Sequence, residues 1–354
     1  MMRLGIIGGG QLARMLALAA RPLGIDCLVV EPAADPPAGP VAEVIRAGYD
    51  DPEAMEQLAH RCAVVTVELE AVPISALEWL ALRVPVHPGP AAIATAADRL
   101  SEKQLFRSLG IATASFDDEV TGVPAIVKTR RGGFDGRGNR VVSTKAELKT
   151  ALDEMPDPIV EGLVPFTREL SIICARSTSG DVGYWPVVEN AHQHGILRRT
   201  TAPAPRLRPQ QQRAAEMLAR LVAEKLEYVG VLAIEMFELA DGTLVANEMA
   251  PRVHNSGHWT IEGAQTNQFE QHVRAVCGLP LGDSSLREPT AMLNCVGRTP
   301  DATAVLKVTG AHLHVYGKAP RPGRKVGHVT VTAPDEPTLA VRVRELIPLV
   351  PFEV

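Results

Sequence analysis

Residues 125–142 read AIVKTRRGGFDGRGNRVV, in which two apolar runs flank a ten-residue loop with four glycines and three arginines. A hairpin turn needs one or two glycines, so this loop has more backbone freedom than a simple connection requires. Backbone amides that can wrap an anion, together with arginine charge, favour a flap over phosphates rather than a plain flexible hairpin. Lys128 ends the first run, where its ammonium group can reach the same phosphates. A Walker-type loop is excluded because Asn139 stands where a lysine is required.

A second feature is a pair of acids on a predicted hairpin. Two apolar strands are joined by Asp241-Gly242, a dipeptide that favours a two-residue type I′ turn. Counting back from that turn places Glu235 opposite Glu248. Carboxylates opposed across adjacent strands repel each other, which predicts a divalent cation between them, with Asn247 as a further oxygen donor. The alternative is a slipped register with one buried acid and one exposed acid.

The segment directly after this hairpin is rich in hydrogen-bond donors. Residues 251–260 read PRVHNSGHWT and hold one guanidinium, two imidazoles, an amide and two hydroxyls. Such groups are costly to bury unless they bind an anion. His254 and His258 have the spacing of zinc ligands on a helix, but Gly257 disfavours a helix there. We therefore expect a bound oxyanion rather than zinc.

Three weaker signals stay open. Gly8–Ala13 fits the G-x-G-x-x-G/A pattern between a strand and a helix, and Glu31 ends the next strand. This turn suits a sugar phosphate, a dinucleotide or no ligand at all, because any phosphate is served equally by such amides. The basic segment 318–325 suits a phosphate and the polar segment 190–199 suits a polar ligand, but each is equally compatible with a solvated loop.

Composition narrows the class of protein. The 354 residues carry a formal net charge of −5, with 22% charged and 4% aromatic residues. This balance favours neither nucleic acid nor a membrane surface as a partner. The five cysteines are scattered without a CxxC pair, which predicts a reducing, cytoplasmic environment.

The motifs together describe ATP-dependent ligation, in which a metal neutralises phosphates while an oxyanion attacks the terminal one. At this level the chain resembles the N5-carboxyaminoimidazole ribonucleotide synthetases of the ATP-grasp superfamily. The motifs that carry the resemblance are GGGQLARM (8–15), DRLSEKQLF (98–106), GGFDGRGN (132–139), NAHQHGILR (190–198), NEMAPRVHNSGHWT (247–260) and RPGRKVGH (321–328).

The resemblance implies an α/β and α+β chain of three domains. A preATP-grasp (Rossmann-like) parallel sheet spans 1–97, an ATP-grasp domain with a mobile lid at about 112–163 spans 98–287, and a small β-rich domain spans 288–354. The implied reaction is ATP- and bicarbonate-dependent carboxylation of the exocyclic amine of 5-aminoimidazole ribonucleotide through carboxyphosphate, in purine biosynthesis. It also implies Mg²⁺, or Mn²⁺ in its place, a cytoplasmic homodimer and a separate mutase that takes the product.

The resemblance also assigns site residues. The ATP contacts would be Arg99, Lys128, Gly133, Phe134, Asp135, Gly136, Arg137, Gly138, Asn139, Glu161, Gly162, Leu163, Val164, Glu169, His192, Asn247 and Glu248. The metal ligands would be Glu235, Glu248 and Asn247. Bicarbonate and carboxyphosphate would meet Arg252, His254, Asn255 and Ser256, and the ribonucleotide would meet Glu70 (or Glu68), Phe134, Asp135, Arg137, Lys318 and Arg324.

Two points within this assignment are specific to the present chain. Asp135 is the carboxylate of the flap, and we expect it to remove the amine proton. Phe134 replaces the tyrosine that is usual in the family, so a hydrogen bond from that hydroxyl is absent.

Three other functions compete with this interpretation. Another ATP-grasp ligase, such as a biotin carboxylase or a formate-dependent transformylase, would share the nucleotide site but not segments 252–260 and 321–328. A pyridine-nucleotide oxidoreductase would use Gly8–Ala13 and Glu31 but would leave the flap unexplained. A non-catalytic ATP-binding regulator would bind ATP without releasing ADP.

Overall fold

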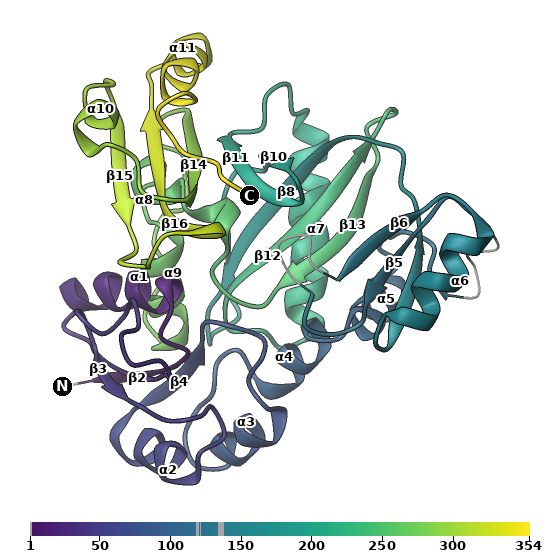
Figure 1. Ribbon diagram of the computed structural model, residues 1–354. Coiled ribbons are helices and arrows are strands. Elements are labelled where there is room, and N and C mark those ends of the chain that lie inside the picture. The colour runs from purple at the N-terminus through teal and green to yellow at the C-terminus, as the bar shows by residue number, and fades with distance from the viewer. Residues whose placement is uncertain (1, 118–119, 121, 134–137) are drawn as a thin grey trace.

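The computed structural model describes residues 2–117, 120, 122–133 and 138–354. Its first unit is a four-stranded parallel sheet in the order β3-β2-β1-β4, drawn in purple in Figure 1. Both faces of the sheet are buried, since Leu4 and Ile6 face α1 while Ile7 and Leu28 face α2 and α3. The elements are β1 (Arg3–Ile7), α1 (Gln11–Ala20), the 3₁₀ turn η1 (Arg21–Leu23), β2 (Asp26–Val30), β3 (Glu43–Ile45), α2 (Pro52–Arg61), β4 (Val64–Val67), α3 (Ile74–Ala81) and α4 (Pro90–Ala96).

A small lid subdomain follows the helix α5 (Arg99–Ser108). It is a three-stranded antiparallel sheet in the order β6-β5-β7, packed against one helix and seen at the right of Figure 1. The β-loop-β arrangement predicted around residues 125–142 is confirmed, because β5 and β6 pair antiparallel. Phe134–Arg137 lie outside the described residues. The elements are β5 (Ala125–Thr129), β6 (Asn139–Val142), α6 (Lys145–Glu154) and β7 (Pro158–Gly162).

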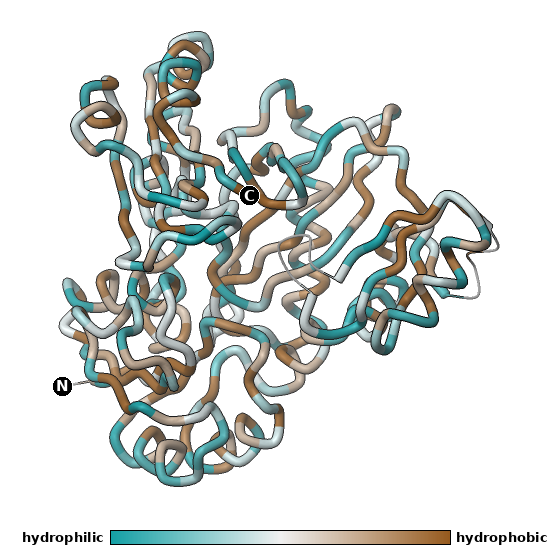
Figure 2. The backbone as a smooth tube through the Cα atoms, in the orientation of Figure 1, coloured by the Kyte–Doolittle hydropathy of each residue, from teal (hydrophilic) through white to brown (hydrophobic). Residues whose placement is uncertain are grey.

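The centre of the molecule is a nine-stranded sheet. Its main path runs β13-β12-β8-β10-β11-β14-β16-β15, with β9 paired to β8, and Figure 2 shows hydrophobic residues concentrated along its strands. One face is covered by α5 and α7 and the other by α9, which also packs against α1. The elements are β8 (Phe166–Arg176), β9 (Val182–Tyr184), β10 (Val188–Gln193), β11 (Ile196–Ala202), α7 (Pro209–Lys225), β12 (Gly230–Leu239), β13 (Leu244–Ala250), η3 (Asn255–Gly257), α8 (Thr260–Gly263) and α9 (Gln268–Val276).

The C-terminal residues extend this sheet instead of forming a sheet of their own. β14 pairs with β11 and with β16, so one sheet continues from the central part of the chain into the last strands. The remaining core under α11 is formed by apolar side chains such as Leu293, Val329 and Leu346. The elements are β14 (Thr290–Gly297), α10 (Ala302–Leu306), β15 (Ala311–Val315), β16 (Arg321–Thr332) and α11 (Glu336–Leu346).

The structure decides the form of two segments. The segment 190–199 is not a loop but most of a hairpin, in which β10 and β11 meet at His194-Gly195. The apolar residues 183–188 do not form one strand, since β9 ends at Tyr184, β10 begins at Val188, and residues 185–187 lie between them. The break falls at Pro186 because proline has no N–H to donate to a ladder. No helix among the described residues is long and apolar enough to cross a membrane.

The hairpin of β12 and β13 confirms the predicted pairing of Glu235 with Glu248, although the predicted turn is wrong. The connection has three residues, since Leu239 and Gly242 close the turn and Leu239 pairs with Thr243. Asp241 accepts a hydrogen bond from the Thr243 amide at 2.8 Å, which stabilises this longer turn. A bulge then shifts the register by one residue, and the two acids again face each other.

A buried histidine joins the first unit to the central sheet. The Nδ1 atom of His272 on α9 accepts from the Val231 amide at 3.0 Å, so Nε2 carries the proton and donates to Thr66 on β4 at 2.8 Å. Both side chains are fully buried. Burial lowers the pKa of His272 to about 3, and the ring is neutral in the folded protein.

This contact predicts a specific acid lability. An unfolded histidine binds a proton below about pH 6.5, whereas folded His272 binds none until about pH 3, so stability is lost as the pH falls through that window. From about pH 7.5 to about pH 5 the loss from this residue is about 2 kcal/mol. Unfolding in urea at several pH values measures it.

The matched variants are His272→Gln and His60→Gln, the second at an exposed position on α2. We expect His272→Gln to be less stable than the parent near neutral pH but to show a shallower dependence on pH. His60→Gln keeps the dependence of the parent. An unchanged slope in His272→Gln would contradict the assignment.

Candidate active site

The acid pair contacts Arg99 and His254 from other elements. Arg99 is the first residue of α5, whose N-cap is Asp98, and its Nη1 atom lies 2.6 Å from Oε2 of Glu248. His254, in the segment after β13, places Nε2 3.1 Å from Oε1 of Glu235. Burial opposes ionisation of Glu248, but the positive charges of Arg99 and Lys128 outweigh it and lower the pKa of this carboxyl to about 2. Glu248 is thus kept ionised, and its charge is partly neutralised by these two cations.

The bulge in β13 turns a third oxygen donor toward the same place. Asn247 is the extra residue between the pairs Glu235–Glu248 and Met236–Ala246. Its Oδ1 atom lies 3.5 Å from Nζ of Lys128, the residue that was predicted to end its strand at the phosphates. No three His, Cys, Asp or Glu side chains in the part of the chain that the structure describes converge on one point. Two carboxylates and one amide oxygen fit Mg²⁺, which takes its other ligands from water and phosphate.

Behind these residues lies a buried ion network. Lys128 and Lys103 donate to the same oxygen of Glu161, at 2.9 and 3.2 Å, and all three side chains are less than a tenth exposed. Although burial opposes it, the two lysines lower the pKa of Glu161. Oε1, the other carboxylate oxygen, is buried without a hydrogen-bond partner among the described residues. An unsatisfied buried acceptor is costly, which indicates a site for a ligand donor.

Sequence reasoning missed Glu102 and Lys103, although a signal was present. Arg99, Glu102, Lys103 and Phe106 occupy one face of α5 at helical spacing, and the last three are buried. Two charged residues on the face that should be apolar indicate buried partners. Lys103 also donates to the backbone carbonyl of Asn247 at 2.8 Å, and Glu102 accepts from the Met249 amide at 2.5 Å. Together these bonds hold β13 at the site.

The two arginines at the start of the flap have partners of their own. Asp98 accepts from Arg130 at 2.6 and 3.0 Å and from Arg131 at 2.9 Å. The predicted use of this charge to match phosphates stays a prediction, and in this structure both arginines pair with Asp98. Their role is to fasten the base of the flap to α5, and Arg99 Nη2 adds a contact of 3.3 Å to the Gly133 carbonyl.

The donor-rich segment after β13 is held from two sides. Gln268, fully buried at the start of α9, accepts from the His254 amide at 2.9 Å and donates to the His254 carbonyl at 2.8 Å. Ser256 bonds the other ring nitrogen of His254 at 2.8 Å. The amide of Asn255 pairs with the amide of Asn294 on β14. Gln268 and Asn294 were not predicted, because only the fold brings them to this segment.

The first unit contributes acids to the same place. Glu70 lies 2.9 Å from Nε of Arg252, whereas Glu68 accepts from the amides of Gly10 and Ala13 at the start of α1. Of the two acids that the sequence left open, Glu70 is thus paired with the predicted oxyanion segment. Because Glu68 already occupies the helix N-terminus, and Glu31 accepts from the Gly9 amide at 2.8 Å, these amides are not presented to a dinucleotide.

The remaining predicted residues surround this centre. His192 on β10 lies 3.0 Å from Glu169 on β8, and although burial opposes it, that carboxylate raises the pKa of the ring. The Gly162 amide, at the end of β7, donates to the backbone carbonyl of Ser115. Leu163, the next residue, is exposed. The two predicted ribonucleotide ligands near the C-terminus have their hydrogen bonds outside the acid pair. Lys318 donates to Gln11 of α1, whereas Arg324 donates to the Ala319 carbonyl at 3.3 Å. The predicted residues Phe134, Asp135, Gly136 and Arg137 lie outside the described residues.

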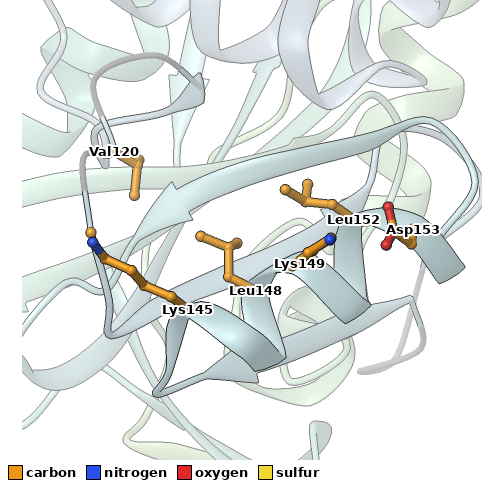
Figure 3. A pocket seen from close by; sticks show the side chains of 7 residues that line it. Val120, Lys145, Leu148, Lys149, Leu152 and Asp153 are labelled. Atoms are coloured by element: carbon orange, nitrogen blue, oxygen red, sulfur yellow. The ribbon is translucent and has the colours of Figure 1, made fainter.

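A hollow on the lid is separate from this site. It has a volume of about 320 Å³, and Figure 3 shows Val120 on one side and Leu148 and Leu152 of α6 beside it. Lys145, Lys149 and Asp153 also line it. None of these residues belongs to the predicted site.

Comparison with known proteins finds relatives that match this chain from end to end. Three family models match: the ribonucleotide synthetase preATP-grasp domain over residues 1–97, the ATP-grasp domain over 107–269, and the phosphoribosylaminoimidazole carboxylase C-terminal domain over 290–342. The N5-carboxyaminoimidazole ribonucleotide synthase of Pseudomonas aeruginosa is 45% identical over 99% of both chains. The chain belongs to the N5-carboxyaminoimidazole ribonucleotide synthase family.

Solved structures of the family share this fold over nearly the whole chain. A synthetase from Thermus thermophilus is 46% identical and superposes with a TM-score of 0.93 over 98% of both chains. A synthase from Aspergillus clavatus, in complex with ADP and 5-aminoimidazole ribonucleotide, is 33% identical with a TM-score of 0.91 over 99% of this chain and 98% of that one. The predicted fold class, with preATP-grasp, ATP-grasp and C-terminal parts, is confirmed, and the oxidoreductase interpretation is wrong.

Glu102 yields a prediction about the buried network. Burial and the charge of Glu248 raise its pKa to about 8, so that the folded protein carries it protonated at neutral pH. Since an unfolded glutamate ionises near pH 4.5, stability falls as the pH rises from there through 8. Glu102→Gln mimics the protonated acid and removes this loss. We expect its thermal midpoint near pH 8 to rise by about 3–6 °C.

Calorimetry of the parent and of Glu102→Gln between about pH 5 and 8 measures the difference. The control is Glu345→Gln, at an exposed position of α11, which leaves the midpoint unchanged. If Glu102→Gln were less stable than the parent near pH 8, the carboxylate would be ionised in the folded protein and the assignment would be wrong.

Proposed function

We propose that this chain carboxylates the exocyclic amine of 5-aminoimidazole ribonucleotide, using ATP and bicarbonate and releasing ADP and phosphate, as a step of purine biosynthesis. The observation that carries the proposal is the match of the whole chain to one family, combined with the acid pair Glu235–Glu248 set among cations. The family uses ATP with Mg²⁺, and members of known structure hold ATP or ADP.

The nucleotide would lie between the lid and the central sheet. The flap residues 133–139 and Lys128 would contact its phosphates, with Arg99 beside them. Glu161 supplies an oxygen that has no partner among the described residues, next to residues 162–164, and this acceptor suits the amino group of adenine. Glu169 and His192, paired at 3.0 Å, would bind further along the nucleotide.

Magnesium would be held by Glu235, Glu248 and Asn247. When bound, it withdraws charge from the β- and γ-phosphates and so favours attack on the terminal phosphorus. The chain's own part is to keep Glu248 ionised through the charges of Arg99 and Lys128, while His254 lies 3.1 Å from Glu235. Arg99 must exchange part of its contact with Glu248 for phosphate oxygens as the nucleotide binds.

The oxyanion segment would bind bicarbonate beside this centre. Arg252, His254, Asn255 and Ser256 supply donors for the carbonate oxygens and the transferred phosphoryl group. A bicarbonate oxygen attacks the γ-phosphorus, the bond to the β-phosphate oxygen breaks, and ADP leaves. The amine then attacks the carbonyl carbon of carboxyphosphate, or CO₂ released from it, and phosphate departs. The closed site protects this anhydride from water.

The ribonucleotide would enter between the first unit and the C-terminal strands. Lys318 and Arg324 supply charge for its phosphate, while Glu70, Phe134 and Arg137 would contact the rest. Asp135 would accept the proton that the amine loses. This role is separable from phosphorylation, because Asp135→Asn would slow carboxylation of the amine while bicarbonate-dependent attack on ATP persists.

The cellular setting is part of the same proposal. We infer a cytoplasmic homodimer whose product, a carbamate, passes to a separate mutase that moves the carboxyl group to carbon. Support comes from family resemblance and from the scattered cysteines, and sedimentation of the purified chain measures the oligomeric state.

The reaction makes a direct prediction. ADP release, followed with a coupled enzyme assay, requires bicarbonate and 5-aminoimidazole ribonucleotide together, and ¹⁴C from labelled bicarbonate appears in an acid-labile product. Stimulation by glycinamide ribonucleotide with formate, or by biotin, would instead support another ATP-grasp ligase. ATP binding without any stimulated ADP release would sink the proposal.

The metal site makes a second prediction. Glu235→Gln or Glu248→Gln removes one charged ligand, and we expect kcat to fall by about 10²–10³-fold with a greater requirement for Mg²⁺. Steady-state assays across Mg²⁺ concentrations measure both effects. Glu224→Gln, on the exposed side of α7, is the matched control and keeps the activity of the parent. A full rate in Glu248→Gln would exclude it as a metal ligand.

A further inference from the structure

Asn294 is a buried polar residue that the proposed chemistry does not use directly. It lies on β14, between its neighbours β11 and β16, and its exposed fraction is 0%. A buried amide is costly unless its donors and acceptors are satisfied. The partners of Asn294 therefore indicate why an amide is kept at this position.

Backbone geometry determines which way the Asn294 amide faces. Its Nδ2 donates to the Leu197 carbonyl on β11 at 2.7 Å. A backbone carbonyl only accepts, so the amide nitrogen must face it, and a flipped amide would set two oxygens against each other. The backbone at this position is held as well, because Arg198 donates to the backbone carbonyl of Asn294 at 2.9 Å.

The orientation of Asn294 in turn determines that of Asn255. Nδ2 of Asn294 donates to Oδ1 of Asn255 at 2.6 Å, and Nδ2 of Asn255 donates back to Oδ1 of Asn294 at 3.1 Å. Such a reciprocal pair uses one N–H of each amide. Asn255 keeps a second N–H, and this atom is on the side of its nitrogen that the pair does not cover.

We propose that Asn294 is a positioning residue for the oxyanion site, and that it holds Asn255 with an N–H toward the carbonate oxygens. This inference rests on the proposed function, since it assigns a partner to one of its bicarbonate ligands. Without its hydrogen bonds to Asn294, the Asn255 amide can flip and present its carbonyl oxygen, which repels an anion. A preorganised donor needs no reorientation when negative charge develops.

The same segment is held independently on its other side. Gln268 of α9 bonds both backbone atoms of His254, as described above. Two elements thus hold the segment: α9 bonds its backbone at His254, and β14 bonds the side chain of Asn255. Loss of Asn294 therefore releases one amide and leaves the path of the chain intact.

A double-mutant cycle tests the proposal. The variants are Asn294→Leu, Asn255→Ala and the double variant, assayed for ADP release with bicarbonate varied and ATP and ribonucleotide in excess. We expect Asn294→Leu to lower kcat/KM for bicarbonate by about 10- to 100-fold, with KM for ATP within about twofold of the parent. On the Asn255→Ala background the same change costs less than about twofold, because the residue through which it acts is gone.

The matched control is Gln271→Leu. Gln271 is also fully buried and makes three hydrogen bonds, to Gly282 and Ser284, away from the site. We expect it to lower the thermal midpoint while kcat/KM for bicarbonate stays within about twofold. If Asn294→Leu does not fold, Asn294→Ser retains a hydroxyl for the Leu197 carbonyl, breaks the reciprocal pair and takes its place in the cycle.

The outcomes separate this inference from the function on which it rests. Multiplicative losses in the double variant, or an equal loss in Gln271→Leu, would overturn the role of Asn294 and show only a structural effect. A parent protein without bicarbonate-stimulated ADP release would overturn the proposed function itself. Non-additive losses confined to bicarbonate would support both.

Discussion

Two like charges face each other across β12 and β13, and the arrangement of the site follows from that constraint. Glu235 and Glu248 would destabilise the hairpin if they were left alone. Arg99 reaches one from α5 and His254 reaches the other from the segment after β13. The bulge at Asn247 keeps the acids in register. Lys128 of the lid and Arg99 of α5 balance the charge of Glu248, and the donor-rich segment places His254 beside Glu235.

The continuous sheet explains how distant parts of the chain meet there. β11 carries the Leu197 carbonyl, β14 carries Asn294, and both belong to the same sheet as the acid pair. The first unit is joined through Thr66 and His272, whose buried bond ties β4 to α9. Because β-strand pairing is rigid over such distances, a side chain on the C-terminal strands can set the orientation of one at the site.

Particular residues show what could be predicted from the chain alone. The pairing of the two acids was predicted from their spacing around a two-residue turn. The turn in fact has three residues, and the bulge at Asn247 shifts the register by one so that the two acids still pair. Lys103 was within reach, since a charged residue on the buried face of α5 calls for a partner. Gln268 and Asn294 were out of reach. Gln268 lies among other polar residues and Asn294 in an apolar strand, and the partner of each lies on another element of the fold.

The glycine-rich flap, the acids and the donor-rich segment are short-range patterns, and they were enough to predict ATP-dependent ligation, whereas the fold class and the family came from the resemblance to a known family that these motifs carry. Local spacing is sufficient there because each motif is built from neighbours along one strand or loop. The packing of the elements was needed to show that Arg130 and Arg131 anchor the flap, that Glu68 caps α1, and that the amides of Asn294 and Asn255 pair. Those contacts depend on which groups meet across elements, and hydrogen-bond partners far apart in the chain leave no periodic trace in it.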